Sequence, residues 1–467
     1  MCYNILKYCK YILKGVKAMK KTIFSVVCAA LAVCFLLSSC DSAEFIRPVN
    51  SLISPPVYYE EYAELVEAFN DKVSKNASLC SPNKGEHRSA IVVEDLDSDG
   101  ETEALIFYID STDPSVARMH YFDIVDGRWI SCGDFTGYGN EVEKLVITDM
   151  DSDGSSELVV IWRVSGVASN SIMSVYRSQL KSDEYKEISN EACSVCEVVD
   201  IDSDSRKEIF FISQTQTDGI IQRLARVMKL SGNEVVLMGE TKIDPNISAY
   251  TSFKTEKVSG DSPLRIYVDA LKGESQMITE LIYWDKDKSE LCAPLLDPET
   301  LTNTSTLRYQ PIACADINND GIIDIPVQRS LLATGDDSAT TVTESIYITE
   351  WIDFISGNAE TVQNALVNYT DGYMICLEKK EIETTGIRNY SSQNCWVVYK
   401  TDGEGNSVGE LYSVLKIDAE RWKSEDFSAY ITVVERAENA VCVYITQNGK
   451  SLGIDEDYIA AKILPIP

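Results

Sequence analysis

The sequence predicts a mainly β protein, in which a β-propeller-like array of about five four-stranded blades precedes a small C-terminal α+β domain. Three observations support this fold class. A nine-residue acidic motif occurs four times, each copy lies between two short runs rich in β-branched and aromatic residues, and the copies begin 54, 51 and 116 residues apart. The last spacing equals two periods of about 58 residues, and four short strands in about 50 to 60 residues match one propeller blade.

The repeated motif has the pattern D-x-[DN]-x-D-G-x-x-[DE]. Its copies are residues 95–103, 149–157, 200–208 and 316–324. Oxygen-bearing side chains at positions 1, 3 and 5 of a tight loop point toward one centre, and a glycine at position 6 permits a left-handed turn around it. A carboxylate at position 9 then closes the shell of oxygen atoms.

Carboxylates gathered around one point repel each other unless a hard cation lies between them, and six or more oxygen ligands suit Ca²⁺. The loops contain no histidine or cysteine, which argues against zinc or copper. A single copy is equally consistent with an ordinary polar turn, whereas four copies that keep the ninth carboxylate favour calcium. The third copy is the weakest, because Ser205 replaces the glycine and Arg206 lies beside it.

The twelfth position of each copy excludes the helical calcium-binding hand. That hand has a glutamate at position 12. Here the position is apolar in all four copies, as Ile106, Val160, Phe211 and Val327. The flanking runs also have the length and residue types of strands. The sequence therefore predicts strand–loop–strand units.

The N-terminus has the features of a secretory signal that ends in a lipid anchor. From Met19, a basic start precedes the apolar stretch Ile23–Leu37 and the sequence Leu-Ser-Ser-Cys, which ends at Cys40. This ending is similar to the bacterial lipoprotein lipobox, which implies lipidation of Cys40 and a location at the cell membrane, facing outside the cytoplasm. Met19 begins a complete signal by itself, so residues 1–18 are consistent with an over-extended start. A membrane-spanning helix is the alternative, but the apolar core is short for one.

Five segments are expected along the chain. They are a signal peptide at 1–39, a tether at 40–56, a helix and its lead-in at 57–85, the blade array at 86–366, and a small α+β domain at 367–467. Apolar residues at helical spacing predict the helix within Tyr58–Lys75. A degenerate blade without acidic ligands is expected near residue 258, from strand-like runs at Phe253–Val258 and Leu264–Ala270.

The period is lost after Asn368. Strands are predicted there at Gly372–Glu378, Asn394–Tyr399, Glu410–Ile417, Tyr430–Glu435 and Ala440–Thr446. Short helices are predicted at Ala419–Ser424 and Asp455–Lys462.

The acidic motif, placed between the first two strands of a blade, resembles the FG-GAP/VCBS repeat of integrin α-type β-propellers over roughly residues 50–365. The lipobox, the pair Pro55–Pro56 and the segments that flank the first loop also resemble uncharacterised clostridial surface lipoproteins. The family implies loops that bind structural Ca²⁺ on a face away from other ligands. Integrin propellers have seven blades, whereas five are counted here. The implied metal ligands are Asp95, Asp97, Asp99 and Glu103; Asp149, Asp151, Asp153 and Glu157; Asp200, Asp202, Asp204 and Glu208; and Asp316, Asn318, Asp320 and Asp324.

Charge and cysteine content restrict the possible partners and chemistry. The formal net charge of −31 becomes −37 without the six lysines of residues 1–39, which makes nucleic acid a poor partner. Nine cysteines follow Cys40, an odd number, and several lie in apolar runs, which favours free buried thiols. Cys193 and Cys196 form a C-x-x-C pair, but one strand would place them on opposite faces, so no redox role is expected.

Recognisable catalytic motifs are lacking. His87 and His120 are the only histidines, both isolated in sequence, and neither G-x-S-x-G nor H-E-x-x-H occurs. The leading hypothesis is a lipid-anchored extracellular bacterial protein, in which a calcium-stabilised propeller binds a glycan or a protein. The alternatives are a propeller-type polysaccharide-degrading enzyme, a lyase or glycosidase that uses a carboxylate pair, and an envelope assembly component that binds through its C-terminal domain.

Overall fold

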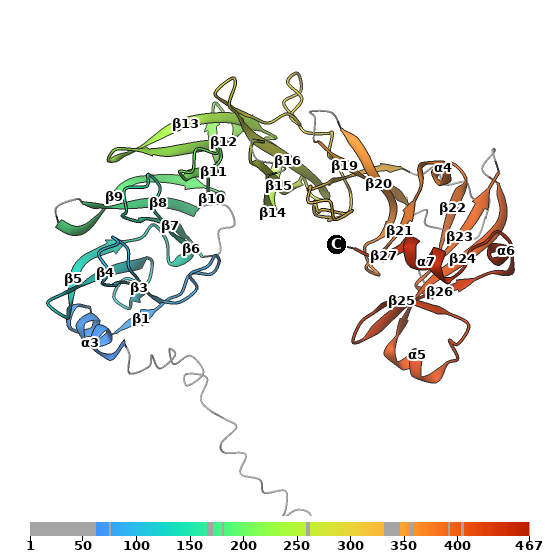
Figure 1. Cartoon of the computed structure of the whole chain (residues 1–467), viewed down its shortest axis with the longest axis horizontal. Helices are drawn as coiled ribbons and strands as arrows, with labels where there is room; N and C mark the ends of the chain where they lie inside the picture. The colour runs from blue at the N-terminus through green and yellow to red at the C-terminus, as the bar shows by residue number, and fades with distance from the viewer. Residues whose placement is uncertain are drawn as a thin grey trace, which may run out of the picture. The chain divides into compact units, whose positions relative to one another are not determined.

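The computed structural model describes residues 62–466, apart from 74–75, 166–170, 180–181, 258–261, 331–345, 355–358, 391–392 and 403–405 (Figure 1). The predicted signal peptide, Cys40 and the tether lie outside the described residues. The chain divides into two units, residues 1–67 and 68–467. Among the described helices, none has the length and apolar character needed to span a membrane. The first described helix, α3 (Ala63–Lys72), lies within the helix predicted from the sequence.

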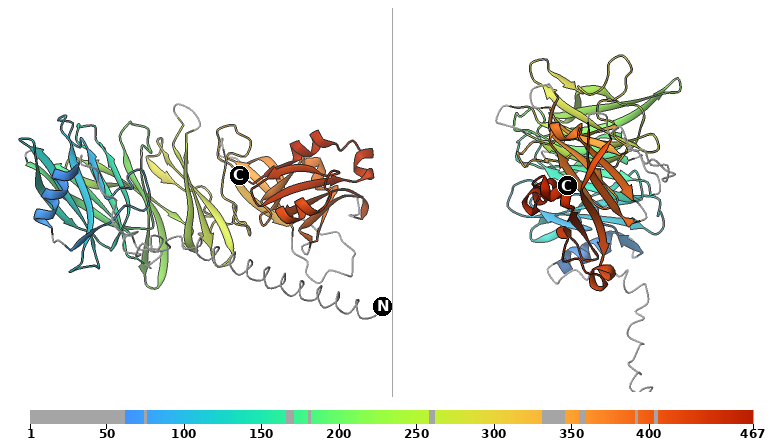
Figure 2. Two further views of the ribbon diagram at one scale, coloured as in Figure 1. Left: turned by 90° about the horizontal axis from the view of Figure 1, so that it is seen from below. Right: turned by 90° about the vertical axis from the view of Figure 1, so that its right-hand side faces the viewer.

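The described strands form six antiparallel sheets that follow one another along the chain (Figures 1 and 2). Sheet 1 contains β1 (Ala77–Leu79), β2 (Ile91–Glu94), β3 (Glu103–Asp110), β4 (Ala117–Val125) and β5 (Arg128–Thr136). Sheet 2 contains β6 (Glu141–Thr148), β7 (Glu157–Arg163), β8 (Ser171–Gln179) and β9 (Ser182–Cys193). Sheet 3 contains β10 (Val195–Val199), β11 (Glu208–Thr217), β12 (Ile220–Ser231) and β13 (Glu234–Ile243).

Sheet 4 contains β14 (Ile247–Glu256), β15 (Arg265–Lys272), β16 (Gln276–Asp285) and β17 (Glu290–Cys292). Sheet 5 contains β18 (Ile325–Ser330), β19 (Tyr347–Asp353), β20 (Glu360–Asn368), β21 (Tyr373–Leu377) and β27 (Ile463–Pro465). Sheet 6 contains β22 (Thr385–Tyr390), β23 (Cys395–Thr401), β24 (Ser407–Asp418), β25 (Ile431–Glu435) and β26 (Asn439–Ile445). Sheets 2, 3 and 4 have four strands each, in chain order, so the predicted mainly β class with four-stranded antiparallel sheets is confirmed.

The sheets pack face to face with their neighbours in chain order. Phe107 of sheet 1 and Trp162 of sheet 2 share one core cluster, in which their rings are 6.1 Å apart. On β11, Phe211 packs toward sheet 2, whereas Phe210 belongs to the core shared with sheet 4. Because successive strand residues point to opposite faces, a strand buried on both faces needs an unbroken apolar run. This burial explains the apolar runs that follow the acidic loops.

Among the described residues, the packing contacts do not close the row of sheets into a ring. The core clusters of the described residues join each sheet to the next one, and none of them combines residues of sheet 1 with residues of sheets 5 or 6. The propeller architecture and its blade number therefore stay predictions.

Sheet 5 and sheet 6 share a core that crosses the boundary predicted at residue 366. Strand β20 runs through that boundary, and β27, the last strand of the chain, pairs with β21. One core cluster contains Leu366 of sheet 5 together with Trp396 and Val414 of sheet 6. The segment after residue 367 thus contributes two strands to sheet 5.

All five strands and both helices predicted after residue 367 occur, as β21, β23, β24, β25 and β26 with α5 (Ala419–Ser424) and α7 (Glu456–Lys462). The sequence did not predict β22, β27, α4 (Lys379–Ile382) or α6 (Gln447–Ser451). These unpredicted elements have six residues or fewer, so they carry little periodic signal.

One predicted strand before the fourth loop is wrong. Residues 312–315 form no strand, and Ala315 makes only a single bridge, to Asp324. The backbone of this segment is bonded to buried side chains instead of a neighbouring strand, because Arg308 Nε donates to the carbonyl of Ile312 (2.5 Å) and Asp269 accepts the N–H of Cys314 (3.0 Å).

Candidate metal sites

The four acidic loops are named loop 1 (95–103), loop 2 (149–157), loop 3 (200–208) and loop 4 (316–324). Loops 1, 2 and 3 connect the antiparallel pairs β2–β3, β6–β7 and β10–β11. In each of these pairs, the residue before the loop lies opposite the ninth residue of the motif, as in Glu94↔Glu103. Loop 4 has the same arrangement on a smaller scale, through the bridge Ala315↔Asp324. The predicted strand–loop–strand geometry is therefore present at loops 1, 2 and 3, whereas at loop 4 a single bridge takes the place of the first strand.

Two positions of each loop have a left-handed backbone. At position 6, the φ angles are 95° at Gly100, 96° at Gly154, 87° at Gly321 and 75° at Ser205. At position 4, they are 63° at Ser98, 62° at Ser152, 57° at Ser203 and 60° at Asn319. The sequence predicted the turn at position 6, including its strained form at Ser205, but it did not indicate the turn at position 4.

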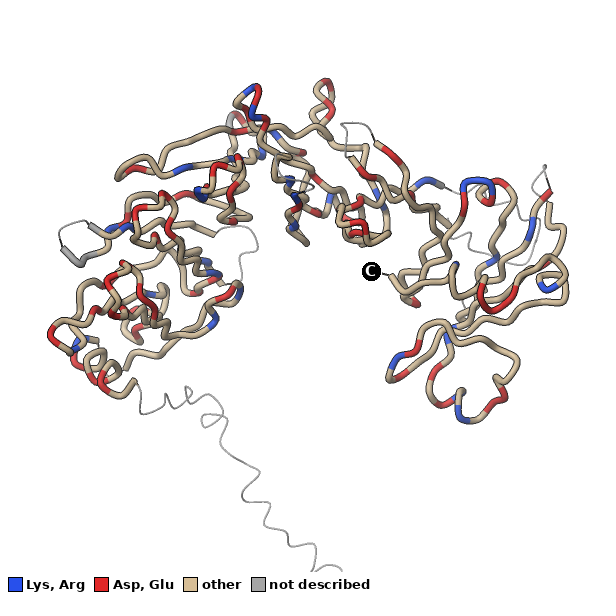
Figure 3. Tube along the Cα trace, viewed as in Figure 1, with Lys and Arg blue, Asp and Glu red and all other residues tan. Residues whose placement is uncertain are grey.

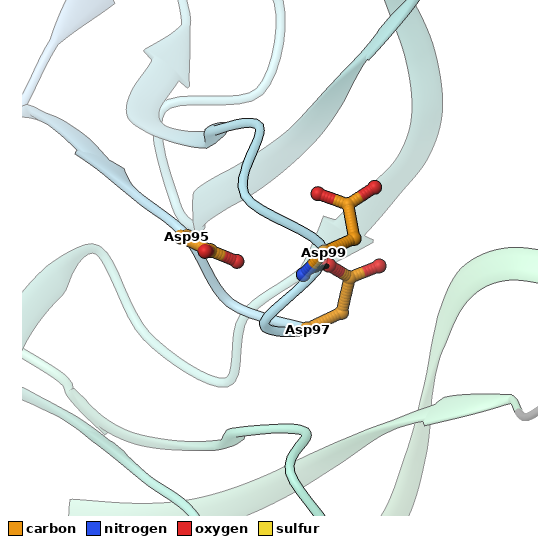
Figure 4. Close-up of side chains that lie close together, drawn as sticks. All are labelled: Asp95, Asp97 and Asp99. Carbon is orange, nitrogen blue, oxygen red and sulfur yellow. Dashed lines mark hydrogen bonds between the residues drawn. The ribbon is translucent and has the colours of Figure 1, made fainter.

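Backbone N–H groups orient the loop carboxylates. The carboxylate at position 1 accepts the N–H of position 6, at 3.1 Å for Asp95 and 2.9 Å for Asp149. The carboxylate at position 5 accepts the N–H of position 7, at 2.7 Å for Asp99. Figure 4 shows the carboxylates of Asp97 and Asp99 side by side and that of Asp95 directed toward them. The loop backbone thus gathers the acidic side chains before any ligand is bound.

In three of the loops, carboxylate oxygens lie within 4.8 Å of one another. The groups are Asp95, Asp97 and Asp99; Asp149, Asp151 and Glu157; and Asp200, Asp202 and Glu208. In loop 4, where Asn318 takes position 3, the amide Nδ2 donates to Asp320 Oδ2 at 2.8 Å, and Asp316 accepts the N–H of Gly321 at 2.9 Å. Such all-oxygen donor sets match those that hard divalent cations prefer.

The ninth residue of every loop is a buried carboxylate. The exposed fractions are 1% for Glu103, 0% for Glu157, 3% for Glu208 and 0% for Asp324. One oxygen of each accepts the N–H of the second loop residue, as at Met150, Ile201 and Ile317, with distances of 2.9, 3.0 and 3.0 Å. The other oxygens of Glu103 and Asp324 have no hydrogen-bond donor. An uncompensated buried carboxylate is costly, so these oxygens fit a bound cation.

Burial changes the protonation of these ninth residues. It raises the pKa of Glu103, Glu157 and Glu208 to about 7 and that of Asp324 to about 6, and the neighbouring loop aspartates add to the effect. The carboxylates therefore bind protons near neutral pH, and a cation has to displace them.

Loop 2 differs from the other loops because a side chain from β8 reaches its carboxylates. Arg177 donates to Asp151 Oδ2 at 2.9 Å and to Asp153 Oδ2 at 2.7 Å, and it forms an ion pair with Glu157 at 3.1 Å. Its exposed fraction is 5%. Nothing in the sequence near loop 2 indicated this contact, because the arginine belongs to a different strand.

Neighbouring loops are hydrogen-bonded to each other. Ser156 of loop 2 donates its N–H to the carbonyl of Leu96 in loop 1 (2.7 Å), and Lys207 of loop 3 donates to Met150 in loop 2 (3.3 Å). The N–H of Ile323 in loop 4 is bonded to the carboxylate of Glu256 in sheet 4. The ordering of one loop is therefore coupled to that of the next.

The degenerate unit expected near residue 258 is present as β14 and β15. Arg265 occupies the ladder position that the ninth carboxylate has elsewhere, and it pairs with Glu256 across the two strands. The two side chains form a buried ion pair at 3.4 Å. Residues 258–261, between the two strands, lie outside the described residues. In this unit an arginine replaces the carboxylate, so the fold tolerates the loss of an acidic site.

The C-x-x-C pair does not lie in a single strand, so the expectation that its members face apart is wrong. Cys193 ends β9 and Cys196 belongs to β10, and both are buried beside a cavity of about 250 Å³. A hydrogen bond from Cys193, together with burial, raises the pKa of Cys196 well above its usual range. Cys196 is thus held as a thiol of low nucleophilic reactivity.

His120 lies close to Ser131 and Asp134, although no other histidine or catalytic motif accompanies it in the sequence. Its Nε2 lies 2.8 Å from Ser131 Oγ, and its Nδ1 lies 3.6 Å from Asp134 Oδ1. The second distance exceeds hydrogen-bond range, and the ring is buried against Phe122, at 4.5 Å between ring centroids. The contact lacks the oriented imidazole that a Ser–His–Asp nucleophile requires.

A second group of charged residues is closed off in sheet 4. Asp269 and Arg308 form an ion pair at 2.7 Å, and both are fully buried. Asp244 lies near them, paired with Lys272 at 2.7 Å, and burial raises the pKa of Glu280 to about 7. Because Asp269, Arg308, Asp244 and Glu280 are fully buried, they are suited to holding the backbone and not to contacting a substrate.

No family model matches the chain, and no curated protein sequence matches it. Similar solved structures include the exotype rhamnogalacturonan lyase YesX, with a TM-score of 0.29 and 10% identity over 71% of this chain and 73% of that one. The Bacillus licheniformis rhamnogalacturonan lyase PL11 has a TM-score of 0.30 and 10% identity, over 71% and 77%. The Chaetomium thermophilum Sqt1 has a TM-score of 0.27 and 10% identity, over 81% and 100%. Likeness at this level carries no argument about function.

Proposed function

We propose that this chain is a lipid-anchored extracellular bacterial protein, in which a β-propeller of the FG-GAP/VCBS type is stabilised by Ca²⁺ and presents a binding surface to a glycan or a protein. The observation that carries the calcium role is the repeated loop geometry. Four loops of equal length each end in a buried carboxylate, and in three of them carboxylate oxygens lie within 4.8 Å of one another. Millimolar Ca²⁺ outside the cell makes such structural sites practical.

A row of aromatic residues from α5, the segment that follows it and β26 of sheet 6 supports a glycan as the bound partner. Trp422 is 43% exposed and stacks on Phe427, with ring centroids 5.4 Å apart. Phe427 contacts Tyr430, which in turn contacts Tyr444, so the rings form a continuous row. A cavity of about 220 Å³ beside Trp422 is also lined by Arg436. Apolar ring faces next to polar groups suit a sugar, which has both kinds of surface.

Removal of metal tests the calcium role. The soluble chain from residue 41 should melt at a lower temperature after its metal has been removed by a chelator, and CaCl₂ should restore the original value. NaCl at the same ionic strength is the control for charge screening, because the protein is strongly acidic. Equal melting temperatures with and without Ca²⁺ would refute the metal assignment.

Substitution of the predicted lipidated residue tests the anchor. Cys40→Ala should release the protein from the membrane fraction or block its maturation. Cys28→Ala, the same change within the apolar part of the signal, should leave the fractionation unchanged. A membrane fraction that is unaffected by Cys40→Ala would contradict the lipid anchor.

A glycan array probed with the soluble chain tests the binding role, with a protein pull-down from envelope extracts as the second arm. Trp422→Ala should reduce glycan binding at least tenfold, whereas Tyr390→Ala, at an exposed aromatic residue of sheet 6, should not. Glycan binding that survives Trp422→Ala would remove the aromatic row from the proposal.

A further inference from the structure

We propose that one residue decides whether an acidic loop binds Ca²⁺, and that this residue lies on the strand paired with the one that directly follows the loop (β4, β8 and β19 for loops 1, 2 and 4). Asp123 and Asp353 complete the sites at loops 1 and 4, whereas Arg177 takes the place of the cation at loop 2. This inference rests on the proposed calcium role and goes beyond it, because the motif alone assigns a cation to all four loops.

The strand registers place these residues at equivalent positions. Each lies directly opposite the ninth carboxylate of its loop, one step beyond the ladder pairs Ala104↔Phe122, Leu158↔Tyr176 and Ile325↔Ile352. The facing pairs are Glu103 with Asp123, Glu157 with Arg177, and Asp324 with Asp353. In sheet 3 the same register places Lys229, which is exposed, opposite Glu208. The position therefore differs in charge between otherwise similar units.

Arg177 places a fixed positive charge among the carboxylates of loop 2. Its guanidinium bonds to Asp151 and Asp153 at 2.9 and 2.7 Å and pairs with Glu157 at 3.1 Å, so three of the four expected ligands are engaged. The planar guanidinium fork suits several carboxylates at once and keeps its charge when buried. A divalent ion at the same centre would meet this fixed positive charge and would have to displace it.

Asp123 and Asp353 have the opposite effect at loops 1 and 4. The strand register places Asp123 across from Glu103 and Asp353 across from Asp324, and the side chain of Asp353 is buried. The oxygens Glu103 Oε1, Asp324 Oδ1 and Glu157 Oε1 are all buried and accept no hydrogen bond, but among the ion pairs of the described residues only Glu157 Oε1 has a cationic partner, Arg177 at 3.1 Å. An added carboxylate next to an uncompensated buried one increases the negative charge that a Ca²⁺ ion would neutralise.

Calcium stoichiometry tests the assignment. Equilibrium dialysis of the soluble chain from residue 41 with Ca²⁺ alone should show that Asp151→Asn leaves the number of bound ions unchanged, because loop 2 holds none. Arg177→Asp should add one bound ion per molecule, and the further change Asp151→Asn should remove it again. Asp123→Arg should remove one ion.

The outcomes separate this inference from the calcium role itself. Loss of one ion on Asp151→Asn in the otherwise unchanged protein would show that loop 2 binds Ca²⁺ and would overturn the role of Arg177, while the calcium role would stand. An unchanged chain that binds no Ca²⁺ would overturn both. Circular dichroism checks that the Arg177→Asp and Asp123→Arg variants are folded. If either variant does not fold, the number of ions bound by Asp151→Asn still tests whether loop 2 holds Ca²⁺.

Discussion

Position 6 of the acidic loops is a glycine in loops 1, 2 and 4 and a serine, Ser205, in loop 3. The φ angle of Ser205 is 75°, in the left-handed region, where a side chain costs about 1 to 2 kcal/mol. We predict that Ser205→Gly will raise the free energy of unfolding by up to about 1 kcal/mol, since the entropy of the added glycine offsets part of the gain. Urea unfolding of the soluble chain, with Ca²⁺ absent, measures the change.

The reverse substitution in loop 2 is the matched control. Gly154 has a φ angle of 96°, and nothing lies within 4 Å of a Cβ atom built there, so Gly154→Ser tests backbone strain alone. It should lower the free energy of unfolding by a similar amount. A loss of stability on Ser205→Gly would show that the serine hydroxyl contributes more than the strain costs.

At the scale of single residues, the sequence predicted what lies within the motif and missed what the register brings to it. Positions 1, 3, 5, 6 and 9 follow from the spacing, because a tight loop has few ways to gather its side chains. Arg177 could not be found in this way, since it is 20 residues beyond Glu157 and faces it only through the β7–β8 pairing. The proximity of Arg177 to Glu157 could be inferred only once the register of β7 and β8 was known.

At the scale of strands, residues 312–315, directly before loop 4, form an irregular segment where a strand was predicted. Asp269 receives hydrogen bonds from Arg308, Thr279 and the backbone of Cys314, all within 3.0 Å. Residues 312–315 form a strand-like apolar run in the sequence, but their backbone is bonded to the buried ion pair of Asp269 and Arg308. Local pattern therefore predicts strands well where pairing is between neighbours in sequence, as at β14–β15, and poorly where the partner is distant, as at β27.

We predict that Arg308→Met will lower the free energy of unfolding by about 3 to 5 kcal/mol, because it leaves the carboxylate of Asp269 buried without its cation. The double variant Asp269→Leu/Arg308→Met should be less destabilised than the single one. Thermal or urea unfolding measures both.

An exposed ion pair in sheet 5 provides the control for this experiment. Arg329 pairs with Glu350 at 3.1 Å, but its side chain is 69% exposed. Arg329→Met should therefore change stability by less than about 1 kcal/mol. If the Arg308 and Arg329 variants lose equal stability, the buried pair does not hold the segment before loop 4.

At the scale of the whole molecule, acidic residues outnumber basic ones by 73 to 42, and they recur along every sheet (Figure 3). The four ninth carboxylates are among the buried acidic residues. Their pKa values of about 7 and about 6 lie above the usual 4.5 of glutamate and 3.8 of aspartate. A folded-state pKa above the unfolded value means that protonation favours the fold, so the contribution is present at low pH and is lost as the pH rises through the folded value.

We therefore predict that the metal-free soluble chain will become less stable between pH 5 and pH 8. Added Ca²⁺ should oppose this loss, because the ion binds the deprotonated carboxylates that the higher pH produces. The difference between the melting temperatures with and without Ca²⁺ should consequently grow from pH 5 to pH 8. Metal-free protein prepared by dialysis is required, since a chelator would itself lose affinity at the lower pH.

Glu103→Gln separates the contribution of one ninth residue from the general charge of the protein. The amide keeps an oxygen that can accept the N–H of Leu96, but it does not titrate and binds Ca²⁺ less well. This variant should reduce both the pH-dependent loss of stability and the gain from Ca²⁺, whereas Glu234→Gln, at an exposed strand end, should alter neither. A gain from Ca²⁺ that is constant from pH 5 to pH 8 would show that the buried carboxylates are not its ligands, because the proton and the ion would then not compete for the same oxygens.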